Sequence, residues 1–260
     1  MNGERLSASD RVLHIPDSSL TNLEHGLSYA GPGVARLTEV VSSTFLEQLL
    51  DEMNDTNLVQ WRDAGDIYLN GRGVRIIQNH DVFALKLSEG DQSYVDRVPH
   101  MTQLMRESEQ FVRTLGHRYP SLQNWEADEM SYHSYYDAEV GLSFHRDNLR
   151  FNGVIVVIAL EGECDFQVID REPLAWVFDE ESGRDVVTEW TWRSTYTIPT
   201  KPGDMVLTRA TGLLPGMTAQ DNPEHAVMNV RVLPRKSFMV RANSKPHDQG
   251  YGFEYQNWGS

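Results

Sequence analysis

Beyond Pro120 the chain alternates apolar and polar residues in short segments, which is the pattern of strands with one buried face. Gly, Pro and Asp residues separate these segments at intervals of about ten residues, a spacing typical of an all-β barrel or sandwich. We therefore predict a mainly β protein. The expected strands are 129–136, 142–145, 153–160, 165–169, 175–178, 185–190, 194–198, 204–208, 226–232 and 237–240.

Two earlier segments have apolar residues at helical spacing. The first includes Phe45, Leu49 and Met53 and is expected to begin after a Ser or Thr cap within 42–44. The second lies within 94–115 and is expected to begin near Pro99, because proline is favoured in the first turn of a helix. We interpret both as helices that pack against the sheet.

The remaining N-terminal segments give weaker signals. Residues 1 to about 40 mix Ser, Gly and Pro with few apolar positions, so little regular structure is expected there. Short β-rich segments at 59–61, 67–69, 74–77 and 82–87 predict strands or hairpins.

Charge and composition restrict the partners. Lys and Arg total 23 against 38 Asp and Glu, a formal net charge of −15. Such a surface repels phosphate backbones, so nucleic acid is a disfavoured partner. The longest apolar run, 154–160, is far shorter than the roughly 20 residues of a membrane span, and no membrane association is expected. The start MNGERLSASD lacks the pattern of a secretory signal, and Cys164 has no second cysteine to pair with, which predicts a reducing, cytoplasmic setting.

The candidate chemistry begins with His145-Arg146-Asp147. On an extended chain, side chains two residues apart share a face, so His145 and Asp147 point into one pocket. They form two thirds of the 2-His-1-carboxylate triad that binds non-haem Fe(II), although a plain structural pair is the alternative. Of the later histidines, His225 stands at the start of an expected strand and His247 in a polar tail. His225 is therefore the expected third ligand.

Ten residues after His225, a basic segment offers a place for an anion. On a strand, Arg235, Ser237 and Arg241 face the same side, and two inward guanidinium groups need an anionic partner. A dicarboxylate such as 2-oxoglutarate supplies one, because Arg can bind its distal carboxylate through two hydrogen bonds. The alternative is a solvated basic strand edge.

These residues together resemble the Fe(II)/2-oxoglutarate-dependent dioxygenases of the double-stranded β-helix, or jelly-roll, fold. That family has H-x-D, a distal His and then an Arg on the last barrel strand. The AlkB-like branch is the closer resemblance, with R-x-N-x-T-x-R on the last strand and N-x-Y-x-P-G on the first. Here the two motifs read Arg235-x-Ser237-x-Met239-x-Arg241 and Ser134-x-Tyr136-x-Ala138-Glu139.

The resemblance implies a site and an architecture. His145, Asp147 and His225 would bind Fe(II), and Arg235 would bind 2-oxoglutarate with Tyr136, Ser237 and Arg241 as further contacts. O2 would be the second co-substrate. It also implies an N-terminal extension (1–120) with helices that buttress one sheet, a double-stranded β-helix core (121–243) and a C-terminal tail (244–260), which we expect to form one structural domain.

The implied activity is oxidation, most simply hydroxylation, of a small organic substrate with release of succinate and CO2. The missing Asn, Thr and Pro-Gly of the AlkB-like motifs make a demethylase of nucleic acid or protein the alternative, and a non-catalytic β-barrel binding module a further one. The loop 209–223, with apolar Leu213, Leu214 and Met217, is expected to enclose the substrate.

A competing motif is the protein-kinase loop H-R-D-x-x-x-x-N, which His145-Arg146-Asp147 and Asn152 also satisfy, with Asp165-Phe166 near the place of D-F-G. However, no G-x-G-x-x-G precedes it and no A-P-E follows. Because kinase chemistry requires all of these parts together, we favour the oxygenase interpretation.

Overall fold

A computed structural model describes residues 11–16, 18–55, 62–63, 76–78, 98–127, 129–135, 142–147, 151–179, 184–216 and 222–242. The helices are α1 (Ser18–Leu27), α2 (Ser43–Asn54) and α5 (Pro99–Thr114), followed by the 3-10 turns η3 (Leu115–His117) and η4 (Pro120–Leu122). The strands are β1 (Val34–Leu37), β2 (Arg62–Asp63), β3 (Ile76–Gln78), β4 (Glu129–Tyr135), β5 (Leu142–His145), β6 (Val154–Asp179), β7 (Arg184–Thr200), β8 (Met205–Arg209) and β9 (Glu224–Arg241).

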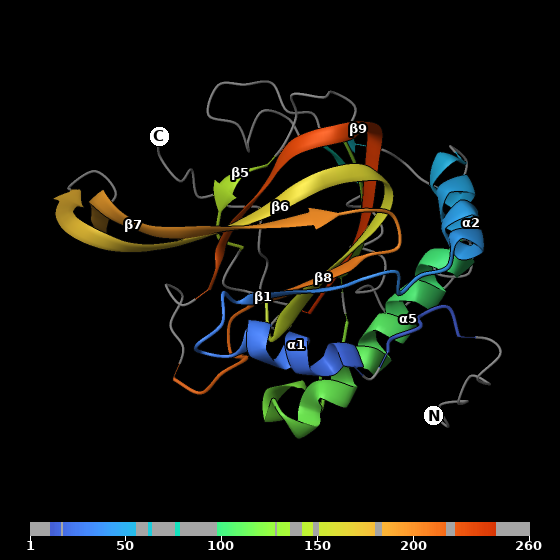
Figure 1. Cartoon of the computed structure of the whole chain (residues 1–260), viewed down its shortest axis with the longest axis horizontal. Helices are drawn as coiled ribbons and strands as arrows, with labels where there is room; N and C mark the ends of the chain where they lie inside the picture. Colours follow the sequence, from blue (N-terminus) through green and yellow to red (C-terminus); the bar gives the residue numbers. More distant parts are fainter. Residues whose placement is uncertain are drawn as a thin grey trace.

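The strands form one antiparallel sheet in the order β1-β8-β6-β9-β4-β3-β2. Off this path, β5 pairs with β9 and β7 pairs with β6. The two long strands β6 and β9 pair along most of their length, and each also pairs with different strands at its two ends. The sheet therefore curls around an interior, with α1, α2 and α5 outside it on one side (Figure 1).

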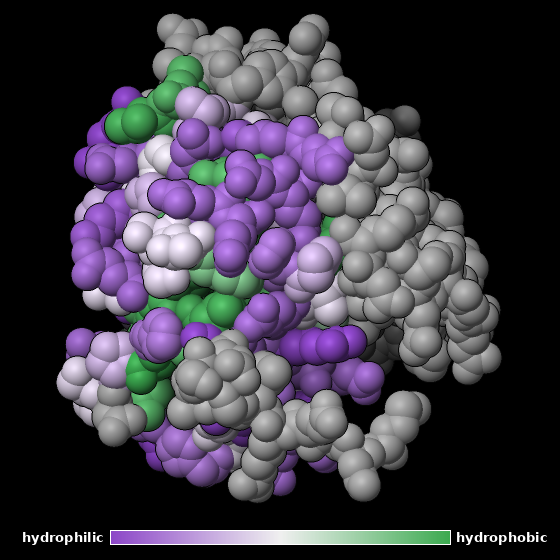
Figure 2. All heavy atoms as spheres, turned by 90° about the vertical axis from the view of Figure 1, so that its right-hand side faces the viewer, coloured by the Kyte–Doolittle hydropathy of each residue, from purple (hydrophilic) through white to green (hydrophobic). Residues whose placement is uncertain are grey.

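The two faces of the curled sheet bury different side chains. Facing the helices, alternate residues Val154, Val156, Ile158 and Leu160 of β6 join the main hydrophobic core with α1, α2 and α5. A smaller interior cluster contains Tyr135, Cys164, Phe166, Val168, Val206 and Val227. The surface on the side of α2 and α5 is mostly hydrophilic, as expected for amphipathic helices that cover a core (Figure 2).

Glu52, a residue of α2, connects this helix to α5 and to strand β4. Its carboxylate, 5 % exposed, accepts hydrogen bonds from the backbone N–H groups of His100 and Met101 at 2.9 Å and from the Tyr132 hydroxyl at 3.0 Å. These N–H groups belong to the first turn of α5, which has no intrahelical acceptors for them. A carboxylate there also interacts favourably with the helix dipole.

We expect Glu52→Gln to lower the free energy of unfolding by about 1 to 2 kcal/mol, the range of a lost helix cap. The amide places an NH2 group where one oxygen now accepts from the start of α5, and it removes the negative charge. Urea unfolding measures the change. Glu47→Gln, at an exposed position of the same helix, is the control and should stay within about 0.5 kcal/mol of the parent. Equal stability of both variants would contradict the capping role.

Several expected elements are confirmed. Helix α2 begins after the cap Ser42, whose hydroxyl accepts from Phe45 N at 3.3 Å, and α5 begins at Pro99. Strands β4 and β5 match the segments 129–136 and 142–145, although Tyr136 lies outside the described residues. Of the expected strands at 59–61, 67–69, 74–77 and 82–87, only 74–77 overlaps the described residues, where it corresponds to β3. The tail 244–260 lies outside the described residues.

The expectation of little regular structure before residue 40 is wrong. Helix α1 buries Leu23 and Leu27 completely, and β1 pairs with β8 from Val34–Thr208 to Leu37–Met205. Gly26 allows the helix to lie against β1, because a Cβ there would come 2.4 Å from the Val34 carbonyl oxygen. The few apolar residues of this segment are enough to stabilise its helix and strand, because they pack against the main hydrophobic core.

The expected separate short strands are instead continuous. Segment 153–160, apart from Gly153, belongs to β6 together with segments 165–169 and 175–178. Segments 185–190 and 194–198 belong to β7, and segments 226–232 and 237–240 belong to β9. Gly162, at φ 75°, is accommodated as a bulge where the register between β6 and β9 shifts. Beyond Ile169, β6 and β7 extend as a paired arm that projects from the barrel (Figure 1).

No helix among the described residues is both long enough and apolar enough to cross a membrane.

Candidate functional site

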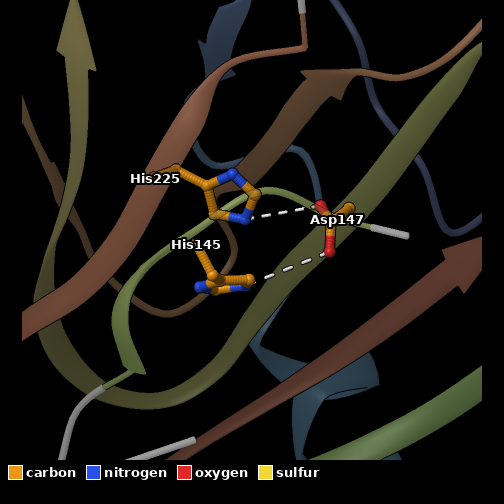
Figure 3. Close-up of side chains that lie close together, drawn as sticks. All are labelled: His145, Asp147 and His225. Carbon is orange, nitrogen blue, oxygen red and sulfur yellow. Dashed lines mark ion pairs between the residues drawn. The ribbon is translucent and has the colours of Figure 1, made fainter. Parts of the chain in front are cut away.

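The end of one strand and the start of another bring the predicted metal ligands together. His145 is the last residue of β5, and it lies directly opposite His225, the second residue of β9, in the antiparallel pair. Their ring centroids are 4.6 Å apart. Asp147 follows β5 by two residues and turns its carboxylate toward both imidazoles (Figure 3). Strand pairing therefore unites residues that are far apart in the sequence.

The geometry fits a metal site with three protein ligands. His145 Nε2 lies 4.0 Å from one carboxylate oxygen of Asp147, and His225 Nε2 lies 3.4 Å from the other. The three ligand atoms all lie within 4.8 Å of one another. Two imidazoles and one carboxylate are the donor set of the facial triad, which leaves coordination positions open on Fe(II).

The His225 imidazole is held in its neutral form. Burial lowers its pKa to about 4, although the nearby Asp147 carboxylate acts in the opposite direction. The imidazole is therefore neutral near pH 7, as metal binding requires. Its Nδ1 lies 3.4 Å from the Pro223 carbonyl oxygen, which favours a proton on Nδ1 and a free lone pair on Nε2. Phe166 stacks on the ring at 5.1 Å and fixes its plane.

Arg146 ties the two ligand segments to each other. Its Nε donates to the Asn222 carbonyl at 3.2 Å, just ahead of β9. The middle residue of H-x-D thus holds the His145–Asp147 segment against the strand that carries His225.

Arg235 is a buried cation on the interior face of the barrel. Its side chain is 3 % exposed; Nε donates to Cys164 Sγ at 3.0 Å, and Nη1 lies 3.5 Å from Ser237 Oγ. The guanidinium also lies 4.6 Å from the centre of the Tyr135 ring. Among the described residues no carboxylate lies within 4.0 Å of it. Because a buried charge is costly without a partner, this guanidinium is suited to an incoming anion.

Arg241, six residues further along β9, has an anionic partner within the protein. Its Nη2 donates to Glu129 at 3.0 Å, and its guanidinium lies 4.0 Å from the centre of the Phe151 ring. Arg235 and Arg241 look alike in the sequence. Among the residues that the structure describes, however, Arg241 has a carboxylate partner and Arg235 has none.

Comparisons with known proteins bear on the fold. No protein-family model and no curated protein sequence matches the chain. Among solved structures, the non-haem alpha-ketoglutarate-dependent epimerase SnoN from nogalamycin biosynthesis is similar with a TM-score of 0.57 at 14 % identity, over 87 % of this chain and 83 % of that one. A prolyl hydroxylase from Trichoplax adhaerens, in complex with a peptide, reaches 0.51 at 12 % identity over 89 % and 92 %. The barrel is a double-stranded β-helix.

Within the double-stranded β-helix, antiparallel register explains which residues share the interior. Tyr135 lies opposite Arg235, and Glu129 lies opposite Arg241 on β4 and β9. Sequence reasoning missed Tyr135, Glu129 and Cys164 as neighbours of the two arginines. The period of β4 alone could have indicated the first two, because Glu129 and Tyr135 are an even number of residues apart. Burial raises the pKa of Tyr135 to about 12, so its hydroxyl stays protonated at neutral pH.

The expectation that Leu213 and Leu214 form a substrate-covering surface is wrong. Both are buried in the main core, and the Ser121 hydroxyl donates to the Leu213 carbonyl at 3.0 Å. Thr211 pairs with Asn152, which fixes the start of the loop. The first half of 209–223 therefore packs on the double-stranded β-helix, and Met217 lies outside the described residues.

The kinase interpretation is also wrong. Asp165 and Phe166 lie within β6, paired with Pro199 and Ile198 of β7, where a kinase needs a metal-binding loop. His145 and Asp147 face a second histidine in the double-stranded β-helix.

Proposed function

We propose that this chain is an Fe(II)- and 2-oxoglutarate-dependent oxygenase that oxidises a small organic substrate, most simply by hydroxylation, and releases succinate and CO2. One observation carries the proposal: a His-Asp-His group lies in the same barrel as a buried arginine that has no carboxylate partner among the described residues. The first feature fits the metal, and the second fits the distal carboxylate of the co-substrate. The fold supports the assignment.

In this proposal each side chain has a defined task. His145, Asp147 and His225 hold Fe(II), which when bound supplies the electrons that activate O2. Arg235 binds and orients the distal carboxylate of 2-oxoglutarate inside the barrel, where burial excludes competing water. Ser237 lies beside Arg235 and can donate to the same carboxylate. Arg241 stays a predicted further contact, and so does Tyr136, which lies outside the described residues.

The substrate class rests on charge and on the similar structures. A net charge of −15 opposes binding to phosphate backbones, which favours a small molecule. SnoN has been solved in a complex with Fe3+, alpha ketoglutarate and nogalamycin RO, which shows that a similar barrel accommodates an organic metabolite. The AlkB-like placement gains no support from these structures, so a demethylase of nucleic acid or protein stays the alternative. We keep the cytoplasmic setting as a proposal based on the single cysteine.

Anaerobic addition of Fe(II) and 2-oxoglutarate tests the proposal. We expect a weak visible charge-transfer band from the chelated keto acid, and after admission of O2 the release of succinate. A non-catalytic binding module would give neither. Turnover should then be stimulated by members of a panel of amino-acid, terpenoid or polyketide metabolites, with a shallow dependence on salt. Stimulation by oligonucleotides alone, lost steeply as salt increases, would instead favour the demethylase.

A further inference from the structure

Cys164 is the only cysteine of the chain and is completely buried next to Arg235. Its Sγ lies 3.0 Å from Arg235 Nε and 3.0 Å from Thr200 Oγ1. The Thr200 hydroxyl also lies 3.2 Å from the Cys164 carbonyl oxygen. Three strands, β6, β7 and β9, therefore meet at one sulfur atom.

The hydrogen atoms of this group can be assigned from its chemistry. Arg235 Nε can only donate, so the sulfur accepts there. When the Thr200 hydroxyl donates to the Cys164 carbonyl, the thiol proton can in turn be donated to Thr200 Oγ1. A neutral thiol thus satisfies every partner, and the sulfur is held in place from two sides.

A fixed Nε restricts the rest of the guanidinium. The group is planar, so a hydrogen bond at Nε and the Tyr135 ring across its face leave it little freedom to rotate. Its terminal NH groups are then the edge available to a carboxylate, which prefers two parallel hydrogen bonds. Because this orientation exists before the ligand binds, less conformational entropy is lost on binding.

We propose that Cys164 is a positioning residue for the co-substrate: it accepts a hydrogen bond from Arg235 Nε and so directs the terminal NH groups toward the distal carboxylate of 2-oxoglutarate. The inference rests on the proposed function, because it assigns a role inside the same binding site. The competing explanation is that Cys164 only fills space in the interior cluster with Phe166 and Val206.

A matched pair of substitutions separates the two explanations. Cys164→Ala and Cys164→Ser both remove the bulk of the sulfur, but only serine keeps an acceptor for Nε. We expect the alanine variant to weaken 2-oxoglutarate binding about tenfold, the factor that 1.4 kcal/mol represents. The serine variant should recover a clear part of that loss. Val206→Ala, which removes bulk from the same cluster without a polar contact, should leave the affinity within about twofold of the parent.

The measurement is the dissociation constant of 2-oxoglutarate for the Fe(II)-loaded protein without O2, together with KM and kcat. A positioning role predicts a higher dissociation constant and KM with little change in kcat. Equal affinity of the alanine and serine variants, at whatever level, would overturn the inference.

Should the alanine variant fail to fold, Thr200→Val decides. Loss of the hydroxyl that holds the sulfur should weaken 2-oxoglutarate binding about threefold, and unchanged binding would refute the role. If the parent protein itself binds no 2-oxoglutarate, the proposed function fails instead.

Discussion

Asp147→Ala should abolish 2-oxoglutarate turnover while the barrel stays folded. Asp147 is the only anionic member of the three-ligand group, so its loss removes both a ligand and the charge that balances a divalent cation. Loss of a residue that merely supports a metal ligand typically costs 10- to 100-fold in metal affinity, and loss of the ligand itself should cost at least about 100-fold. Asp147 lies outside the hydrophobic core clusters, so its substitution removes no apolar core packing.

Iron content after desalting, succinate release and the thermal midpoint together test this prediction. His145→Ala and His225→Ala should also be inactive. Asp51→Ala, at an exposed position on α2, is the control for loss of a carboxylate elsewhere and should bind iron like the parent. Retention of full turnover in Asp147→Ala would refute the metal assignment, and so would equal iron content in the Asp147 and Asp51 variants.

The grouping of the three candidate ligands could be predicted in part because the signal of the first two is local. His145 and Asp147 are two residues apart on extended chain, and this spacing alone places them on one side. His225 required a further step, namely that a histidine at the start of a later strand pairs with the end of β5. The observed pairing of His145 with His225 confirms that the three residues come together.

The fold could be predicted at the level of its class, because alternation identifies strands whose one face is buried. The lengths of β6 and β9 could not be predicted: Gly162 and Pro234 read as breaks in the sequence, yet the long pairing between the two strands continues past them. Helix α1 was missed for a related reason. Leu23 and Leu27 are too few to give a clear period, and they are stabilised by a core that the rest of the chain provides.

The difference between the two interior arginines could not be read from the sequence. Both stand at inward positions of one strand, in the segment 235–241. Glu129, which neutralises Arg241, is 112 residues away, and Cys164, which contacts Arg235, is 71 residues away. Only the register of β4 and β6 against β9 reveals these neighbours, and register depends on contacts across the whole barrel.

This difference predicts opposite effects of the same substitution on stability. Arg235→Met replaces a buried cation that has no described carboxylate partner by an apolar side chain of similar length. The free energy of unfolding without ligand should rise, by about 1 kcal/mol or more, because desolvation of the charge no longer opposes folding. Arg241→Met takes the cation away from the Glu129 carboxylate, which is 5 % exposed, and should lower stability by about 3 to 5 kcal/mol.

In Arg235→Met, the affinity for 2-oxoglutarate should fall although the free energy of unfolding without ligand rises. Loss of a charge-assisted bidentate pair costs about 2 to 5 kcal/mol, so Arg235→Met should weaken 2-oxoglutarate binding by roughly one to three orders of magnitude. Arg235→Lys should recover only part of this, because an ammonium group cannot form the planar pair of hydrogen bonds.

In the parent, 2-oxoglutarate at about 100 times its dissociation constant should add about 2.7 kcal/mol to the stability of the Fe(II)-loaded protein, and Arg235→Met should lose most of that gain. Urea unfolding with and without the co-substrate measures both effects. A destabilised Arg235→Met variant that still binds 2-oxoglutarate like the parent would show that Arg235 is a structural cation, and the anion-binding role would have to be given up.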